Sequence, residues 1–264
     1  MCGRFTLTAD LKKIAERFGV MTASPDPYTA ARPDERPLQA KTRTPRRGVP
    51  TNDGGEDGRP GRPLLHPAPR YNIAPTQSVI VIGDDGKRYM KQMRWGLIPS
   101  WAKDPTIGNR MINARVETLS EKPAFRAALK KRRCIIPADS FYEWQKLGKV
   151  KQPLRILLKS REPFGFAGLW EHWTSPEGEE VLSCTIITTA ANELLKPVHE
   201  RMPVILTRDA EARWLDPNTQ DPEKLLPLLK QYPSEEMEFY PVSRDVNSPA
   251  IDKPSNIEPI NTEG

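Results

Sequence analysis

The sequence predicts an α+β fold, in which a mostly antiparallel curved sheet or barrel carries helices at its periphery. Segments typical of strands dominate the chain, and the helices among them do not alternate with strands as regularly as in a parallel α/β protein. The 264 residues, 37% of them hydrophobic, are enough to bury one proper core. We therefore expect a single domain over residues 1–260, interrupted by one insertion at about residues 23–69.

The chain begins with a predicted strand and a predicted helix. Gly3–Leu7 is typical of a short strand, which would carry the N-terminus into the body of the fold. Thr8 is the expected N-cap of the following helix, and Gly19 is its expected end. Between them, apolar residues recur with the spacing of one helix face: Leu11, Ile14, Ala15 and Phe18.

The segment Ala23–Pro69 differs in composition from the rest of the chain. Ten of the 28 prolines fall within it, together with many Gly, Asp, Arg and Thr residues and almost no large apolar ones. Such a segment buries too little apolar surface to offset the entropy lost when it becomes ordered. We expect a disordered or loosely held insertion, with a basic arm for nucleic acid as the alternative.

Strands and helices follow in an irregular order after Arg70. Two strands, Ser78–Ile82 and Arg88–Trp95, are predicted to form a hairpin across the turn at residues 83–86. The further expected strands are Arg133–Ile136, Leu154–Leu158, Gly165–Leu169, Val181–Thr188 and Met237–Val242. The further expected helices are Pro123–Lys131, Arg208–Leu215 and Pro222–Leu229, and proline is well tolerated at the first position of a helix.

Composition and charge exclude several classes of protein. No run approaches the roughly 18 apolar residues of a membrane span, and the N-terminus lacks the apolar core of a signal peptide. The net charge of +6 and the pI of 9.2 are compatible with an anionic partner such as nucleic acid. The three cysteines and three histidines have no metal-binding spacing, so we expect no disulfide framework, no metal and no cofactor.

Cys2 is the first residue with distinctive chemistry. Removal of Met1 would leave an N-terminal cysteine, which carries an amine and a thiol on adjacent carbons. Both groups titrate near enough to neutral pH to react there. The amine condenses with an aldehyde to a Schiff base, and the thiol then closes a five-membered thiazolidine ring. By position alone, a cysteine with no special role is the alternative.

Glu143 is the second such residue, because it lies between Tyr142 and Trp144 in an otherwise apolar run. An unpaired buried carboxylate is costly, so this one has either a partner or a function. Burial would raise its pKa, which suits a group that transfers protons. A structural salt bridge is the alternative.

Six motifs occur along the chain in a fixed order. They are MCGRF at the N-terminus, RYNIAPTQ at Arg70–Gln77, WGLIPSW at Trp95–Trp101, INARVET at Ile112–Thr118, CIIPADSFYEW at Cys134–Trp144 and HERMPVIL at His199–Leu206. In this order and spacing they closely resemble the SRAP family, the abasic-site shield proteins, and its bacterial members in particular. The resemblance extends from Met1 to about Ile260. The main departure is the Pro-rich insertion, which is longer than the family's usual link.

The resemblance implies a catalytic set of four residues: Cys2, Asn113, Glu143 and His199. It implies that Cys2 captures the open-chain aldehyde of an abasic deoxyribose and that Asn113 holds the reacting end of Cys2. It implies that Glu143 assists opening of the sugar ring, and that His199 moves protons near neutral pH. From the residues alone, Asn113 as a turn or cap residue and His199 as a structural histidine stay open.

The resemblance also implies a surface for single-stranded DNA, formed by Arg4, Asn72, Pro75, Trp101, Arg115 and Thr189. The two arginines are expected to bind phosphates, and Trp101 to stack on or wedge beside a base. Asn72 and Pro75 are expected to shape the pocket wall, and Thr189 to lie near the lesion. An ion pair with Glu117 is the alternative for Arg115, whereas we expect Trp95 to be a core residue.

These residues predict an enzyme of the DNA damage response that crosslinks itself to abasic sites in single-stranded DNA. Lyase-like activity and self-processing that removes Met1 are expected to accompany this reaction. A cysteine peptidase with Cys2 as its N-terminal nucleophile is one alternative, and a non-covalent single-stranded DNA binder is another. We expect a monomer in the cytoplasm, associated with the nucleoid if the protein is bacterial.

Overall fold

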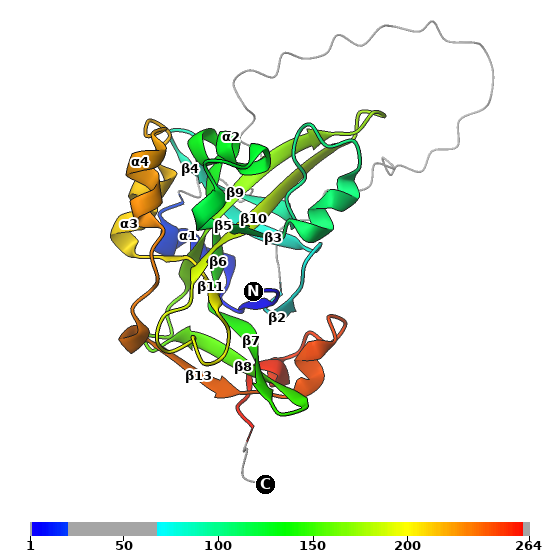
Figure 1. Ribbon diagram of the computed structural model, residues 1–264, viewed down its shortest axis with the longest axis vertical. Helices are drawn as coiled ribbons and strands as arrows, with labels where there is room; N and C mark the ends of the chain where they lie inside the picture. The colour runs from blue at the N-terminus through cyan, green and yellow to red at the C-terminus, as the bar shows by residue number, and fades with distance from the viewer. Residues whose placement is uncertain (1, 21–67, 261–264) are drawn as a thin grey trace, which may run out of the picture.

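The computed structural model describes residues 2–20 and 68–260, and within these ranges two sheets form the body of the molecule. Figure 1 shows one sheet above the other, with most helices around the upper sheet and the N-terminal strand between the two. The predicted insertion at residues 23–69 lies outside the described residues as far as residue 67.

The larger sheet closes into a five-stranded barrel, which confirms the predicted class and curvature. Its strands, in spatial order, are β4 (Arg88–Trp95), β3 (Ser78–Asp84), β6 (Arg133–Ala138), β9 (Phe164–Thr174) and β10 (Glu180–Ala190). Pairing of β10 with both β9 and β4 closes the ring. Among the described strands, only the pairings of β10 with β4 and with β5 (Asn113–Arg115) are parallel. Two further strands join this sheet, β11 (Arg201–Pro203) and β12 (Ile205–Leu206).

The smaller sheet carries the N-terminus. Its strands, in spatial order, are β13 (Met237–Pro241), β8 (Val150–Leu158), β7 (Ser140–Leu147), β1 (Phe5–Leu7) and β2 (Arg70–Ile73). The sequence did not predict β7, because its first four residues are all buried and therefore show no alternation of apolar and polar side chains. The centre of the smaller sheet is therefore β7, a strand whose two faces are both covered at its first end.

The helices lie at the periphery, as predicted. They are α1 (Leu11–Phe18), α2 (Pro123–Lys131), α3 (Arg208–Leu215) and α4 (Pro222–Leu225). The predicted cap of α1 was wrong: Asp10 caps it, while the Thr8 hydroxyl and amide both donate to Asp139. The last helix is also shorter than predicted, because Pro227 has no N–H to continue the α-helical ladder and residues 226–228 form a 3₁₀ turn.

Aromatic rings pack the two sheets against each other. Phe5 of β1 meets Trp95 of the barrel edge to face, with ring centroids 5.2 Å apart, and meets Phe166 of β9 at 5.8 Å. Phe141 of β7 meets the same Phe166 at 6.0 Å. Edge-to-face contacts of this kind add about 0.5–1.5 kcal/mol each to the burial of the rings. One aromatic cluster therefore fixes how the N-terminal strand lies on the barrel.

Arg133 ties the ends of two helices to the barrel. Its buried guanidinium donates to the carbonyls of Leu129 and Lys130 at the end of α2, at 2.9 and 2.6 Å. It also donates to the carbonyls of Trp214 and Asp216 at the end of α3, at 2.6 and 2.5 Å. The last carbonyls of a helix have no partner inside the helix, so one side chain satisfies both helix ends.

Replacement of Arg133 by Met is expected to lower the free energy of unfolding by about 2–4 kcal/mol, because buried carbonyls lose their donor. Urea unfolding followed by circular dichroism measures this. The matched control is Lys131→Met at the exposed end of α2. It is expected to change the free energy of unfolding by less than about 0.5 kcal/mol. Equal losses in the two variants would contradict the role of Arg133.

Candidate functional site

Strands β1 and β7 bring the N-terminal segment beside Glu143. They pair antiparallel with Phe5 opposite Phe141, and continuing this register by two residues places Gly3 opposite Glu143. The neighbouring Cys2 is completely buried and belongs to the hydrophobic core. Strand pairing therefore brings together Cys2 and Glu143, two of the four predicted catalytic residues.

Asn113 joins the N-terminal segment to the other sheet. Its side-chain nitrogen donates to the backbone carbonyl of Cys2 at 2.8 Å. Its side-chain oxygen is buried and accepts no hydrogen bond from the described residues. Asn113 opens β5, which runs parallel to β10 with Asn113 opposite Ile186. Asn113 therefore contacts Cys2 at its carbonyl and keeps an unengaged acceptor beside it, while its hold on the reacting end of Cys2 stays a prediction.

Strands β10 and β11 bring in the third part of the site. Arg115 lies opposite Thr188 in β10, and Arg201 of β11 lies opposite Ala190. His199 lies two residues before the start of β11, and its Nδ1 accepts the backbone N–H of Arg201 at 2.9 Å. Because Nδ1 is the acceptor, the neutral ring carries its proton on Nε2. The backbone of β11 therefore fixes the tautomer of His199.

Glu143 and His199 share a pocket of about 530 Å³. Its other lining residues are Trp144, Lys151 and Asn247, none of which the sequence singled out. The Trp144 indole donates to the Asn247 side-chain oxygen at 2.7 Å. An indole N–H is a donor only, so this bond orients the amide and leaves its NH₂ group on the other side. The pocket thus combines an acid, an imidazole, a cation and an amide.

Burial governs the ionisation of the two central groups. Burial raises the pKa of the Cys2 thiol far above its ordinary value, and the negative charge of Glu143 raises it further. Burial also raises the pKa of the Glu143 carboxyl, although the positive charges of the amino terminus and His199 act in the opposite direction. Both groups therefore favour their protonated forms, as predicted for Glu143.

Arg4 and Asn72 support the N-terminal segment from behind. Arg4 donates to the Asn72 side-chain oxygen at 2.8 Å and to the carbonyls of Val246 and Asn247 at 2.5 and 3.1 Å. Asn72 is fully buried, and its NH₂ group donates to the carbonyls of Val246, Ser248 and Ile251. The polar atoms of Asn72 are therefore used inside the protein, and its expected role in shaping the pocket wall stays a prediction. Phosphate binding by Arg4 stays a prediction.

The remaining predicted DNA contacts differ in exposure. Trp101 is the most exposed large hydrophobic side chain among the described residues, at 59%, whereas Trp95 is completely buried, as predicted. Arg115 is exposed and Pro75 half-buried, while Thr189 is 8% exposed. DNA contact by these residues stays a prediction.

Arg201, and not Arg115, forms the ion pair with Glu117. It forms a two-pronged ion pair with Glu117, at 2.6 and 3.0 Å, and also donates to the Thr188 carbonyl at 2.6 Å. The partner of Glu117 is therefore Arg201, and the alternative ion pair between Arg115 and Glu117 is wrong. The HERMP motif placed Arg201 two residues from His199, but its role depends on a pairing of strands that the sequence does not display.

Two close glycines shape the loop that presents Trp101. A Cβ at Gly96 would come within 2.5 Å of the Gly108 carbonyl oxygen, and a Cβ at Gly108 within 2.7 Å of the Gly96 oxygen. Gly96 also has a φ of +129°, which other residues rarely adopt. Gly96 of WGLIPSW and Gly108 of the 3₁₀ helix Pro105–Arg110 therefore meet backbone to backbone, and the segment between them holds Trp101 outward.

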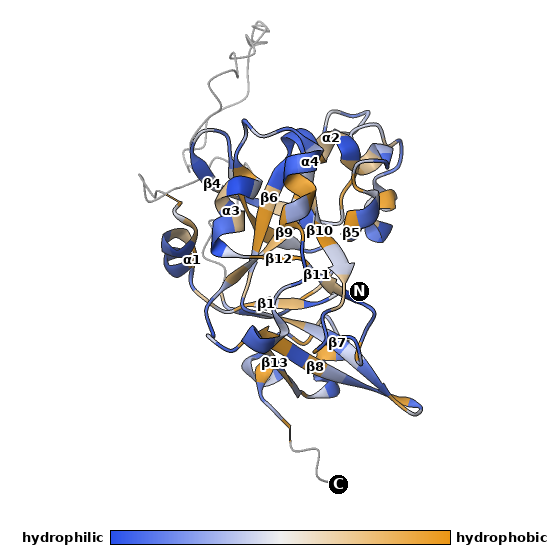
Figure 2. Ribbon diagram, turned by 60° about the vertical axis from the view of Figure 1, so that its left-hand side comes forward, coloured by the Kyte–Doolittle hydropathy of each residue, from blue (hydrophilic) through white to orange (hydrophobic). Residues whose placement is uncertain are grey.

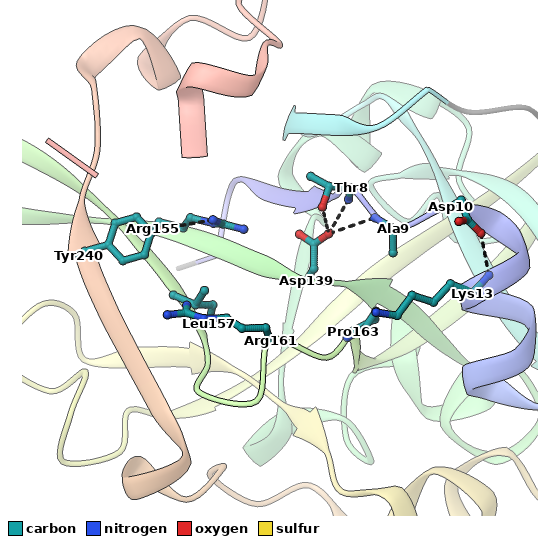
Figure 3. A pocket seen from close by; sticks show the side chains of 10 residues that line it. All are labelled: Thr8, Ala9, Asp10, Lys13, Asp139, Arg155, Leu157, Arg161, Pro163 and Tyr240. Atoms are coloured by element: carbon teal, nitrogen blue, oxygen red, sulfur yellow. Dashed lines mark hydrogen bonds between the residues drawn. The ribbon is translucent and has the colours of Figure 1, made fainter. Parts of the chain in front are cut away.

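A second pocket, of about 450 Å³, lies away from the predicted site residues (Figure 3). Asp139 enters it, but this carboxylate accepts hydrogen bonds from the amides of Thr8 and Ala9 and the Thr8 hydroxyl. Arg155 lies against Tyr240 and donates to its hydroxyl at 2.6 Å. The polar groups here hold β1 and β13 to the sheet, so we assign the pocket no chemistry.

Cys134, Cys184 and His172 do not line the pocket that contains Glu143 and His199. Cys134 and Cys184 are completely buried, and burial raises the pKa of each thiol. His172 lies within β9, which continues to Thr174. Within residues 2–20 and 68–260, no group of three or more His, Cys, Asp or Glu side chains could hold a metal ion. Nor does any helix of that part of the chain have the length and apolar character to cross a membrane.

Comparison with known proteins places this geometry in context. A family model described as SOS response associated peptidase (SRAP) matches residues 1–249. The abasic site processing protein YoqW of Bacillus subtilis strain 168 is 46% identical over 260 residues, which cover 98% of this chain and 99% of that protein. The abasic site processing protein HMCES of Gallus gallus is 34% identical over 225 residues, covering 73% of this chain and 66% of that one. A crystal structure of a protein from Bacteroides thetaiotaomicron has a TM-score of 0.77 at 26% identity, covering 98% of this chain and all of that one.

The raised pKa of Glu143 predicts a pH-dependent stability. In the unfolded chain this carboxyl ionises near its ordinary value of about 4.3, whereas in the folded protein it holds its proton to higher pH. Folding is therefore less favourable above the folded-state pKa than it is near pH 4. Glu143→Gln removes the ionisation, so we expect a melting temperature about 2 °C or more above wild type at pH 8, with no difference near pH 4.

Thermal melts of the two proteins at a series of pH values measure this gap. The control is Glu200→Gln, since Glu200 is exposed beside the same site and its replacement should give no gap that grows with pH. A Glu143→Gln protein that melts below wild type at pH 8 would show that the ionised carboxylate stabilises the fold.

Proposed function

The chain belongs to the SRAP family, and on that premise we propose that it captures abasic sites in single-stranded DNA as a thiazolidine on Cys2 once Met1 is removed. The observation that carries the proposal is the 2.8 Å bond from Asn113 to the Cys2 carbonyl, which holds Cys2 beside Glu143. The names of the relatives from Bacillus subtilis and Gallus gallus support the class of lesion.

The reaction begins with the amine of Cys2. The amine attacks the C1′ aldehyde of the open sugar, and the adduct loses its oxygen as water to give an imine. The thiol then adds across the C=N bond, with sulfur binding C1′ and the proton going to nitrogen. The net change is loss of one water, and no oxidant, metal or cofactor is required. The five-membered ring needs the amine and thiol of one residue, which only an N-terminal cysteine provides.

Asn113 and Glu143 have complementary roles in this sequence. The unengaged side-chain oxygen of Asn113 accepts an N–H of the Cys2 amine and points its lone pair toward the aldehyde. Glu143, whose raised pKa favours its acid form, protonates the departing hydroxyl and later takes a proton back. His199 exchanges protons through Nε2 in the same pocket. Reversal uses the same groups, so the protein acts as a shield that can also release the lesion.

The DNA follows a surface on the barrel side of this pocket. Arg115 is exposed on β5 and offers a guanidinium to a phosphate, and Trp101 offers a ring to the neighbouring base. Pro75 is half-buried and follows β2, the strand that pairs with the N-terminal strand β1. An abasic nucleotide has no base to unstack, so the cost of base flipping is largely absent.

Covalent capture is expected to require Cys2 and the lesion. Purified protein, with Met1 removal checked by mass, is mixed with single-stranded DNA that carries one abasic site and is run on a denaturing gel. Wild type should give a shifted band, whereas Cys2→Ala, acetylated wild type and intact DNA should give none. Absence of the band for wild type would overturn the proposal. A band that survives acetylation would favour a thiol nucleophile of the peptidase kind, which does not use the amine.

Glu143 and His199 are expected to act at different steps. Glu143→Gln should slow crosslinking about 10²-fold or more, since general acid–base catalysis contributes about 10²–10⁴. His199→Ala should form the crosslink but release it more slowly, measured by transfer from labelled to unlabelled abasic DNA. Normal crosslinking by Glu143→Gln would show that this carboxyl does not transfer the proton.

A further inference from the structure

The β7–β8 hairpin extends past the sheet that carries the N-terminus. Leu147 and Val150 close it as opposite partners, and the two-residue loop between them contains Gly148 at a φ of +60°. Figure 2 shows the hairpin reaching away from the body of the protein, with hydrophobic residues at its tip. Residues 146–151 are all exposed, so neither face of the tip packs on the protein.

The tip concentrates positive charge. It contains Lys146, Lys149 and Lys151 and no carboxylate, and among the described residues none of the three forms an ion pair shorter than 4.0 Å. Lys146 and Lys151 lie directly opposite each other in the register, where like charges destabilise a pair of strands. Folding alone gains nothing from this arrangement, whereas a polyanion would relieve the repulsion.

The face of the tip opposite Lys146 and Lys151 is apolar. Leu147 is 54% exposed and Val150 39% exposed, and they are two of only four large hydrophobic side chains exposed in the described part of the chain. Opposite partners share a face of the hairpin, so these two side chains form one small apolar patch beside the lysines. A ligand that combines phosphates with apolar rings fits both faces.

The tip is continuous with the pocket that contains Glu143 and His199. Lys151 itself lines that pocket. Side chains alternate along a strand, so Glu143, Gln145 and Leu147 lie on the same face of β7. The four steps along the strand from Glu143 to Leu147 span about 13 Å, which is about the axial length of four stacked nucleotides.

We propose that the β7–β8 tip is a second DNA-binding element, which holds the strand that flanks the abasic nucleotide. Its lysines bind phosphates, and Leu147 and Val150 pack against bases of the same strand. The proposal rests on the proposed function, because it takes the lesion to lie in the pocket with Glu143. The strand that leaves this pocket along β7 reaches the tip within a few nucleotides.

The test measures how crosslinking depends on DNA and salt concentration. A variant with Ala at positions 146, 149 and 151 is expected to need about tenfold more abasic DNA for half-maximal rate. The double variant Lys146→Ala with Lys149→Ala, which leaves the lining of the pocket intact, should keep the wild-type rate at saturating DNA. Loss of three phosphate contacts should lower the slope of log affinity against log salt by about 2. Shortening the DNA to one nucleotide on each side of the lesion should remove the difference from wild type.

A matched control removes the same charge elsewhere. Lys122, Lys130 and Lys131 are exposed on or beside α2, which lies at the other end of the molecule from the hairpin (Figure 1). Their triple Ala variant should retain the wild-type slope. A second variant, Leu147→Thr with Val150→Thr, should raise the half-maximal DNA concentration but leave the salt slope unchanged, because it removes no charge.

The outcomes separate this proposal from the proposed function. A wild-type protein that forms no denaturation-resistant product would overturn the proposed function first. A wild type that crosslinks, with a hairpin variant of unchanged DNA dependence and salt slope, would overturn the role of the tip alone. An equal loss of slope in the α2 control would assign the effect to net charge and would also overturn it. Thermal melts of each variant check that the hairpin is still folded.

Discussion

The site depends on one hydrogen bond between two sheets, from the Asn113 side chain to the Cys2 carbonyl at 2.8 Å. Cys2 belongs to the smaller sheet through β1, whereas Asn113 belongs to the barrel through β5 and β10. The bond can form only if the sheets are held in one relative position, and the rings of Phe5, Trp95 and Phe166 provide that position. The aromatic core is thus the framework on which a reactive N-terminus is placed.

The same framework explains why a costly residue is retained. Glu143 is buried, and burial opposes its ionisation, so its carboxyl weakens the fold above its pKa. Nearby positive charge from the amino terminus and His199 offsets part of this cost without removing it. A carboxyl whose pKa is raised, and which therefore favours its acid form, is what proton transfer to a leaving hydroxyl requires. The fold therefore gives up stability at the position where the proposed reaction needs an acid.

The sequence predicted those parts whose signal is local. The helices Arg208–Leu215 and Pro123–Lys131 have the predicted bounds, and the hairpin of β3 and β4 forms across its turn. The sequence did not predict elements whose formation depends on tertiary contacts. An example is β7, whose first four residues are all buried and show no alternation of apolar and polar side chains. In the site, resemblance led to Asn113, Glu143 and His199. The partners Trp144, Asn247 and Arg201 needed the structure, because they meet only through strand pairing and a distant C-terminal segment.

Burial of the Cys2 thiol sets the kind of chemistry that this site favours. A thiol whose pKa is raised by burial is a poor free nucleophile, since the thiolate is the reactive form. The ring closure proposed here does not need a free thiolate, because the imine carbon is already linked to the nitrogen of the same residue. When two reacting groups belong to one molecule, their effective concentration toward each other can reach about 10⁵ M or more. This can compensate for the low intrinsic reactivity of the protonated thiol. In the proposed reaction, a protonated, enclosed thiol is therefore protected from other electrophiles and oxidants, yet would close the ring quickly once the amine has bound an aldehyde.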